Sequence, residues 1–391
     1  MAQELAYVII TPYSLHKSRT GGILSRLVAR TGLDLVGARM FAPSAELVRQ
    51  YAEASVSPDD PQDAQIQELI RDYILKNLSP DPKTGLRRRV MVLLFRGEDA
   101  VRRTRAVVGH LSRDRRTGET IRDTYGDLIY DESGQIRYFE PAVLAAPTPA
   151  EARAKLQLWT RYSDTDGGLL ENVIQYRPGE KAERTLVLIK PDNFRFPTGR
   201  PGNVIDFFSR TGLYIVGIKL HRMSVAEAME FYGPVREVLR TKLKGLVGAR
   251  ARAALEKEFG FPLGPEEERA LGEALGRAYG DNQFENIVRF MSGRAPSECP
   301  PEERHKPGTE KCIALIYEGV DAIAKIREVL GPTDPSKAPP GSIRREFGQN
   351  VMVNAAHASD SPENVQREMN IIRITENTFR QAVEECYGPV N

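Results

Sequence analysis

The most informative segment lies near the end of the chain, where residues 341–368 read GSIRREFGQNVMVNAAHASDSPENVQRE. His357 lies in a short polar loop that follows an apolar segment, with Arg344 and Asn354 before it and Ser359 two residues after it. A neutral imidazole is nucleophilic near pH 7, and arginine donates forked hydrogen bonds to phosphate oxygens. The segment therefore favours capture of a phosphoryl group by His357.

A helix is expected to begin directly after this loop. Ser361 can cap the helix, Pro362 suits its first position, and Glu363 suits the positive end of the helix dipole. Glu368 then lies about two turns into the helix, so its carboxylate can point back at the histidine loop. The other histidines lack such neighbours and are interpreted as ordinary surface or core residues: His16, His110, His221 and His305.

This segment resembles the active-site segment of nucleoside diphosphate kinases, which reads Gly-Thr-Ile-Arg, then Asn-x-x-His-Gly-Ser-Asp-Ser, then a Glu. Ser342 replaces the threonine here, and Ala358 replaces the glycine. The resemblance covers residues 183–385 apart from two insertions. It implies an enzyme that passes the terminal phosphate of a nucleoside triphosphate to a nucleoside diphosphate through a phosphohistidine on His357, with ping-pong kinetics. The alternative is a non-catalytic nucleotide- or protein-binding module built on a degenerate kinase fold.

The resemblance also implies roles for individual residues. His357 is the nucleophile, Ser359 and Glu368 position it, and Lys190 reaches the transferred phosphate. The other implied substrate-binding residues are Tyr232, Arg327, Thr333, Arg344 and Asn354. The resemblance implies Mg²⁺ bound mainly through the nucleotide phosphates, with no metal site made by the protein alone. The position of the family's base-stacking phenylalanine falls on Gln283, beside Phe284, so the nucleotide preference stays open.

The two halves of the chain repeat one pattern. LAYVIITP at 5–12 parallels TLVLIKPD at 185–192, and RTGLDLVG at 30–37 parallels RTGLYIVG at 210–217. An apolar strand and an amphipathic helix follow in each half, at 90–109 and at 312–331. The order of strands and helices predicts an α/β protein with two ferredoxin-like α/β sandwich domains, each with an antiparallel four-stranded sheet covered by helices. The predicted parts are a domain at 1–150, a helical linker at 151–182 and a catalytic domain at 183–391.

The first half lacks the chemistry of the second. Thr11 stands where Lys190 stands, and Leu144 falls at the histidine position after a loop that is nine residues longer. Leucine cannot accept a phosphoryl group. Arg105 and Arg122 remain at the positions of the two phosphate-binding arginines, and we expect them to have a structural role, with weak phosphate binding as the alternative.

Two insertions interrupt the second half. Residues 235–280 are rich in Ala, Leu, Glu, Arg and Lys, which predicts two helices broken at 260–265. Because the family's nucleotide-covering hairpin lies there, this insertion is interpreted as a lid or wall beside the site, or else as a surface for self-association. The second insertion, 294–311, is rich in proline and charge and predicts an exposed loop.

Composition limits the classes of function. The chain has 391 residues, 41% of them hydrophobic and 28% charged, which is typical of a globular protein of two domains. A net charge of +2 argues against general attraction to nucleic acid or membrane. No apolar run approaches about 18 residues, which argues against a membrane span, and no signal-peptide pattern is evident. Three cysteines without metal spacing favour a reducing compartment. We therefore expect a cytoplasmic protein, and the family resemblance implies a homo-oligomer.

Arginine clusters occur at 87–89, 102–103 and 113–116. They are interpreted as solvated faces, with local phosphate binding as the alternative.

Overall fold

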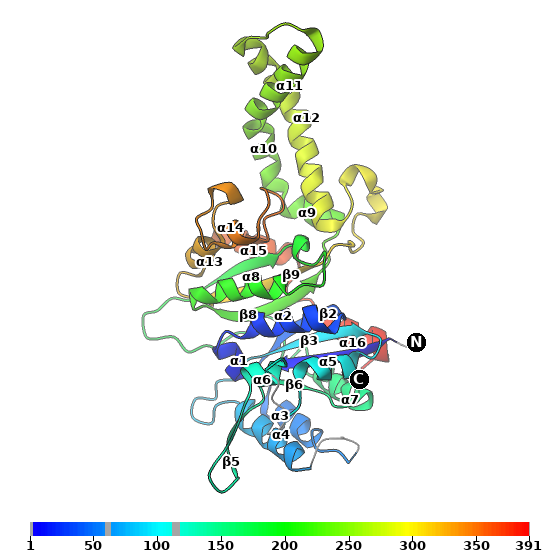
Figure 1. Cartoon of the computed structure of the whole chain (residues 1–391), viewed down its shortest axis with the longest axis vertical. Coiled ribbons are helices and arrows are strands. Elements are labelled where there is room, and N and C mark those ends of the chain that lie inside the picture. Colours follow the sequence, from blue (N-terminus) through cyan, green and yellow to red (C-terminus); the bar gives the residue numbers. More distant parts are fainter. Residues whose placement is uncertain (1–2, 59–63, 112–117, 391) are drawn as a thin grey trace. The chain divides into compact units, whose positions relative to one another are not determined.

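The computed structural model describes residues 3–58, 64–111 and 118–390 (Figure 1). The arginine cluster at 113–116 lies outside the described residues. The chain divides into two compact units. The first unit contains residues 1–220, 313–369 and 373–391, and the second contains 221–312 and 370–372.

The first unit contains two four-stranded antiparallel sheets with the same strand order, β2-β3-β1-β6 in the first half and β8-β9-β7-β10 in the second. The first sheet is built from β1 (Glu4–Ile10), β2 (Asp34–Phe41), β3 (Val90–Gly97) and β6 (Val143–Ala145). The second is built from β7 (Glu183–Ile189), β8 (Tyr214–His221), β9 (Cys312–Gly319) and β10 (Ala356–Ala358). Both sheets carry helices, so the predicted fold class is confirmed.

The central strands β1 and β7 have neighbours on both sides and are buried along nearly their whole length. Their continuous apolar runs are typical of strands covered on both faces. The helices of the first half are α1 (Pro12–His16), α2 (Thr20–Thr31), α3 (Ala45–Glu53), α4 (Ala64–Asn77), α5 (Ala100–Val108), α6 (Ile121–Tyr125) and α7 (Pro149–Arg161). Those of the second half in this unit are α8 (Arg200–Phe208), α13 (Ala322–Leu330), α14 (Ile343–Phe347), α15 (Pro362–Ile371) and α16 (Thr378–Tyr387).

The repeated Thr-Gly pair ends the corresponding helical segment in each half. Gly32 follows α2 with a φ of 61°, and Gly212 follows the 3-10 turn after α8 with a φ of 70°. Glycine adopts this left-handed conformation without steric cost, which explains why the chain can turn there into the next strand.

The two halves pack against each other through equivalent helices, α2 and α8. A Cβ atom on Gly21 would lie 2.2 Å from the Gly202 carbonyl oxygen, and one on Gly202 would lie 2.1 Å from the Gly21 carbonyl oxygen. Only glycine permits this approach. The Asp206 carboxylate of α8 accepts a hydrogen bond from the Gly22 backbone N–H at 3.2 Å, and so caps the first turn of α2 across the contact.

The C-terminal helix α16 packs on elements of the first half, β2 and α7. The Tyr387 hydroxyl donates to the Leu5 carbonyl oxygen at 3.1 Å, and the Arg380 guanidinium donates to the Thr160 carbonyl oxygen at 3.1 Å. The final segment of the chain therefore joins the core of the half that precedes it by more than 200 residues.

The longer loop of the first half contains a β-hairpin that the sequence analysis missed. Its strands are β4 (Asp127–Tyr130) and β5 (Ile136–Glu140), which pair antiparallel. At the tip of the hairpin, the Asp131 carboxylate accepts hydrogen bonds from the backbone N–H groups of Ser133 and Gln135.

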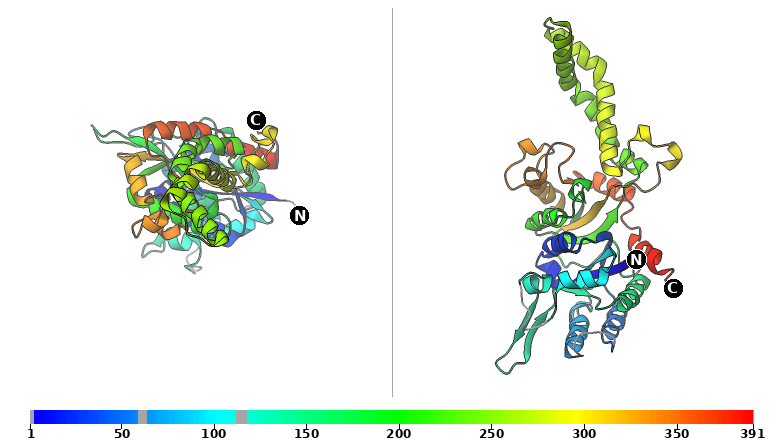
Figure 2. Two further views of the ribbon diagram at one scale, coloured as in Figure 1. Left: turned by 90° about the horizontal axis from the view of Figure 1, so that it is seen from above. Right: turned by 45° about the vertical axis from the view of Figure 1, so that its right-hand side comes forward.

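The second unit is dominated by helices: α9 (Val225–Phe231), α10 (Gly233–Lys242), α11 (Lys244–Phe259) and α12 (Pro265–Ser292). The predicted break at 260–265 is confirmed, but the prediction of two helices is wrong because α10 and α11 separate at Leu243. Figure 2 shows α11 and α12 side by side, and glycines such as Gly248 and Gly272 permit their close packing.

The insertion at 294–311 contains two 3-10 turns, Pro296–Glu298 and Pro301–Glu303. Its prediction as an exposed loop is wrong for Ala295 and Cys299, which are buried. Throughout 3–58, 64–111 and 118–390, no helix is both long and apolar enough to cross a membrane.

Candidate active site

Pairing of β10 with β7 brings Lys190 close to the histidine segment. His357 lies opposite Leu188 in this antiparallel pair. The backbone N–H of Lys190, directly after β7, donates to the Ala355 carbonyl oxygen at 2.9 Å. The lysine and histidine predicted to act together therefore lie at the same end of two neighbouring strands.

The His357 imidazole is held by a carboxylate. Its Nε2 atom lies 2.8 Å from Oε2 of Glu368, and the Ser359 hydroxyl donates to the same oxygen at 2.6 Å. Glu368 comes from α15, whose first turn is capped by Ser361 as predicted. An ionised carboxylate only accepts hydrogen bonds, so this contact favours the tautomer with the proton on Nε2. The lone pair then resides on Nδ1, which is not bound by Glu368.

Lys190 is 7% exposed and lies within a polar cluster. Its ammonium donates to Oδ1 of Asn354 at 2.8 Å and to the Met352 carbonyl oxygen at 3.0 Å. Burial, with the nearby positive charge of Arg344, lowers the pKa of Lys190 to about 7. Lys190 therefore exists in both its protonated and its neutral form near pH 7. An anion that binds nearby would favour the protonated form.

Arg344 connects the elements around the site. Its guanidinium donates to the Gly331 carbonyl oxygen at 3.0 Å and to the Ala356 carbonyl oxygen at 3.3 Å. The Thr333 hydroxyl lies 3.5 Å from the same guanidinium. These contacts join α14, the end of α13 and β10, so the side chain is fixed before any ligand arrives.

Two further predicted residues lie around this cluster. Asn354 is 1% exposed, and its amide nitrogen donates to the Thr333 carbonyl oxygen at 3.1 Å. Arg327 is exposed in the last turn of α13. A hydrogen bond from Asn364, aided by the charge of Arg327, lowers the pKa of Asp360, which lies three residues after His357.

Tyr232 is the exception among the predicted residues because it belongs to the second unit. It lies between α9 and α10, is 8% exposed, and packs its ring 5.0 Å from that of Phe231. Gln283 lies within α12 of the same unit, and the neighbouring Phe284 is buried with Arg236 over its ring. The first unit therefore brings together every predicted site residue except Tyr232.

Sequence reasoning missed two arginines of the site. Arg200 donates to Asn193 at 3.0 Å and to Asp192 at 3.1 Å, and so fixes the loop that follows Lys190. Arg367 donates to the second oxygen of Glu368 at 3.3 Å. Buried carboxylates need partners, so Asp192 and Glu368 were a signal that cations lie nearby, but not which ones.

The first half preserves the geometry of this site without its chemistry. Leu144 lies opposite Ile9, the position equivalent to Leu188, so it occupies the same place in its sheet as His357. Arg122 donates to the Gly109 carbonyl oxygen at 3.0 Å and to the Val143 carbonyl oxygen at 3.3 Å, which repeats the contacts of Arg344.

A different network replaces the lysine in the first half. The Thr11 hydroxyl donates to the Glu140 carboxylate at 3.0 Å, and the Tyr73 hydroxyl donates to the same carboxylate at 2.7 Å. Leu144 is 2% exposed. A buried carboxylate and a leucine thus occupy the place where a phosphate would need positive charge and a nucleophile.

Known proteins resemble this chain over about half of its length. The sequence model of the family described as nucleoside diphosphate kinase matches residues 306–377. A nucleoside diphosphate kinase of Hydrogenovibrio crunogenus is 53% identical over 188 residues, which are 48% of this chain and 90% of the relative. The chain belongs to the nucleoside diphosphate kinase family. A second member of this family, from Staphylothermus marinus, is 32% identical over 190 residues, which are 49% of this chain and 92% of the relative.

Among solved structures of nucleoside diphosphate kinases, that of the Aquifex aeolicus protein has 29% sequence identity and a TM-score of 0.32. The match covers 49% of this chain and 95% of that one. The family match at 306–377 contains Arg327, Thr333, Arg344 and the whole histidine segment.

Proposed function

We propose that the chain is an active nucleoside diphosphate kinase that works from its second half. The observation that supports this most is the hydrogen-bonded set of His357, Glu368 and Ser359, which lies beside Lys190 and Arg344. A histidine with a fixed tautomer, next to positive side chains, is what phosphoryl transfer through an imidazole requires.

In the proposed reaction, Nδ1 of His357 attacks the terminal phosphorus of a nucleoside triphosphate in line. The nitrogen–phosphorus bond forms while the bond to the bridging oxygen breaks, and the diphosphate leaves with that electron pair. The Glu368 carboxylate, 2.8 Å from Nε2, stabilises the positive charge that develops on the ring. A second diphosphate then takes the phosphoryl group back from the histidine.

Positive and hydroxyl donors stabilise the transferred group in this proposal. Arg344 is held in place by backbone carbonyl groups, so it loses little freedom when it binds phosphate. Thr333 is exposed beside it, and Arg327 is exposed near Asp360. Lys190 regains its proton as the phosphate approaches, and Asn354 orients the lysine. Contact of Asn354 with the sugar, and of Tyr232 with the nucleotide, stay predictions of the family resemblance.

The donor set of the site fits Mg²⁺ only as an ion carried by the nucleotide. The described residues contain no cluster of three potential metal ligands, and the carboxylate nearest to His357 is already bound by the imidazole and Ser359. Phosphate oxygens are the ligands that Mg²⁺ prefers in such sites. When bound, the ion would neutralise phosphate charge, while Lys190, Arg327 and Arg344 orient the group.

Labelling with γ-³²P-ATP tests the proposal directly. We expect an acid-labile, base-stable label on the full-length chain, and no label on His357→Ala. His305→Ala is the matched control, because His305 is exposed and belongs to the second unit. Nucleotide binding without any label on the unaltered chain would instead support a non-catalytic module, for which the altered first half is the favouring observation.

A further inference from the structure

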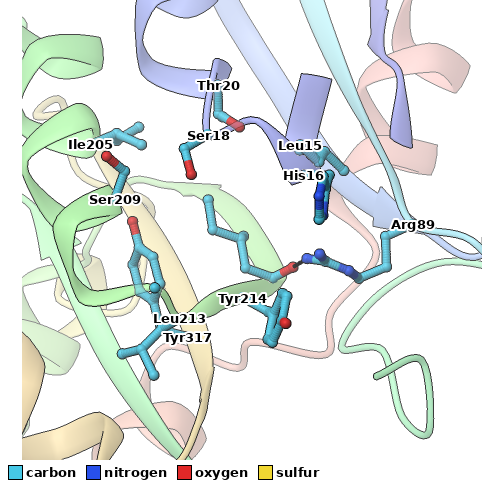
Figure 3. Close-up of a pocket in the computed structure, with 12 residues that line it drawn as sticks. Leu15, His16, Ser18, Thr20, Arg89, Ile205, Ser209, Leu213, Tyr214 and Tyr317 are labelled. Atoms are coloured by element: carbon cyan, nitrogen blue, oxygen red, sulfur yellow. Dashed lines mark hydrogen bonds between the residues drawn. The ribbon is translucent and has the colours of Figure 1, made fainter. Parts of the chain in front are cut away.

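A cavity of about 170 Å³ lies between the two halves of the first unit, and His357 is not among the residues that line it (Figure 3). Leu15, His16, Ser18 and Thr20 line it from the first half, around the start of α2. Ser209, Tyr214 and Tyr317 line it from the second half. Arg89, from one of the arginine clusters seen in the sequence, also reaches this cavity.

Arg89 contributes a positive charge that lacks a counter-ion. Its guanidinium donates to the Ile215 carbonyl oxygen and lies over the Tyr214 ring, 5.1 Å from the centroid. Within the described parts of the chain, no carboxylate forms an ion pair with it, and burial lowers its pKa to about 10. Glu318, whose charge acts on Arg89, is already paired with Arg184 at 2.7 Å. The arginine therefore stays positive at neutral pH and has donors for an anion.

Tyr317 supplies the second independent observation. The residue is 2% exposed, yet its hydroxyl has no hydrogen-bond partner among the described residues. Burying a hydroxyl without a hydrogen-bond partner is unfavourable, so a ligand that accepts a hydrogen bond from Tyr317 would remove this penalty. Figure 3 shows the hydroxyls of Tyr317 and Ser18 pointing into the space between the halves.

One acidic group, the Asp206 carboxylate, lies near the cavity. Added to the effect of burial, it raises the pKa of Tyr317, but it accepts a hydrogen bond from the Gly22 N–H at the start of α2. The positive end of the helix dipole partly offsets its charge. Arg89 is therefore the dominant charge of the cavity.

The cavity is smaller than the roughly 300–1,000 Å³ of a typical site for a drug-sized molecule, so a nucleotide does not fit. We propose that it binds a phosphate-sized oxyanion, either free phosphate or the phosphate of a small monoester, held by Arg89, Tyr317 and the Ser18 hydroxyl. The bound anion would connect the two halves. This inference does not depend on catalysis at His357.

The test measures binding of inorganic phosphate to the full-length chain by calorimetry, against chloride at matched ionic strength. We expect Arg89→Met to weaken binding about tenfold or more, and Tyr317→Phe to weaken it severalfold. Arg88→Met is the matched control, since it removes the same charge from the adjacent residue without lining the cavity. Arg327→Gln changes a residue of the His357 site and should leave phosphate binding in the cavity unchanged.

Thermal unfolding separates binding from folding. The Tyr317→Phe variant should fold at least as stably as the unaltered chain, because its hydroxyl has no protein partner to lose. Equal phosphate affinity in Arg89→Met, Tyr317→Phe and the unaltered chain would overturn the proposal. So would a response that disappears in Arg327→Gln, or no phosphate response at all. Tighter binding of glycerol 3-phosphate than of phosphate would identify a monoester as the ligand, and the reverse would identify free phosphate.

Discussion

At the scale of single residues, the site depends on how one carboxylate is shared. Glu368 is 4% exposed and accepts hydrogen bonds from the His357 imidazole, the Ser359 hydroxyl and Arg367. A buried carboxylate is stable only with such partners. The His357 imidazole is thus oriented by a carboxylate that has its own hydrogen-bond partners, which holds the Nδ1 atom in one direction.

Replacing this carboxylate should lower activity without removing the nucleophile. We expect Glu368→Gln to reduce kcat/KM for phosphate exchange by about 10- to 100-fold, the scale of one charge-assisted hydrogen bond. Steady-state exchange assays would measure this, with labelling of His357 still detectable at long times. Ser359→Ala is the milder comparison, as it removes one donor but keeps the charge. Full activity in Glu368→Gln would show that the carboxylate does not position the imidazole.

Lys190 should make nucleotide binding depend on proton uptake. Burial lowers its pKa from 10.5 to about 7, so the folded chain releases a proton that the unfolded chain keeps between pH 7 and 10.5. The contribution of Lys190 to stability therefore rises with pH in this window. A bound phosphate reverses the shift, and at pH 8 we expect uptake of about one proton.

Calorimetric titration of nucleotide in two buffers of different ionisation enthalpy measures this uptake. The Lys190→Met variant, titrated to saturation, should lose the buffer-dependent part of the heat. A heat that is independent of buffer in the unaltered chain would contradict the prediction.

The grouping of His357, Glu368 and Arg344 in the candidate site was predictable because they lie in one short segment with regular spacing. The low pKa of Lys190 was not predictable from sequence, since it depends on burial by segments more than 150 residues away. Arg200 and Arg367 were missed for a related reason. Arginine is common on protein surfaces, and only the folded chain shows which carboxylate each one meets.

At the scale of elements, the contact of α2 with α8 depends on two glycines. Any side chain on Gly202 would meet the backbone of Gly21, which cannot move aside as a flexible side chain can. We expect Gly202→Ala to lower the free energy of unfolding by about 1–3 kcal/mol through overpacking. Urea denaturation monitored by circular dichroism would measure the change.

The matched control is Gly245→Ala in α11, where an added Cβ meets nothing within 4 Å. Alanine is favoured over glycine in helices, so this variant should keep its stability or gain up to about 1 kcal/mol. If both variants melt alike, the contact of α2 with α8 does not contribute to the fold as described.

The repeated strands and helices were predictable because each half carries the same local signals, an apolar run followed by a turn and an amphipathic helix. The hairpin of β4 and β5 was not predicted, although the extra nine residues of its loop were recognised. Exposed Ile129 lies between more buried neighbours, but Arg137 and Tyr138 are both exposed, and strands of four and five residues give too short a pattern to distinguish from a loop.

At the scale of the whole molecule, α16 makes the two halves interdependent within the first unit. This helix ends the second half in sequence but packs on β2 and α7 of the first. No local feature of residues 378–387 predicts this placement, because an amphipathic helix shows only that one face is buried, not against what. The domain limits of 1–150 and 183–391 therefore stay a proposal about folding units.

Separating the two halves should lower the stability of the second half. We expect the fragment 180–391 to aggregate, pair with itself or melt at a lower temperature, because it would expose the α8 contact and the apolar face of α16. We propose that this packing of equivalent halves stands in for the pairing of identical domains implied by the family, and that the full chain assembles further.

Sedimentation and thermal unfolding of the fragment would test this dependence, with a mixture of 1–179 and 180–391 as the control for restored pairing. A monomeric fragment as stable as the full chain would contradict it. A phosphate label on the first-half fragment would contradict the inert role of Leu144 and Thr11.

Arg122 and Arg344 each donate to two equivalent backbone carbonyl groups, one pair in each half of the chain. Arg122 binds the two equivalent carbonyl groups in a half that has leucine at the histidine position. The first half therefore provides an internal reference, in which the arginine has a structural role and no substrate to bind. The loss of stability in an Arg122 variant measures what these hydrogen bonds contribute to folding. An Arg344 variant should lose a similar amount, and any further effect on activity can be assigned to phosphate binding.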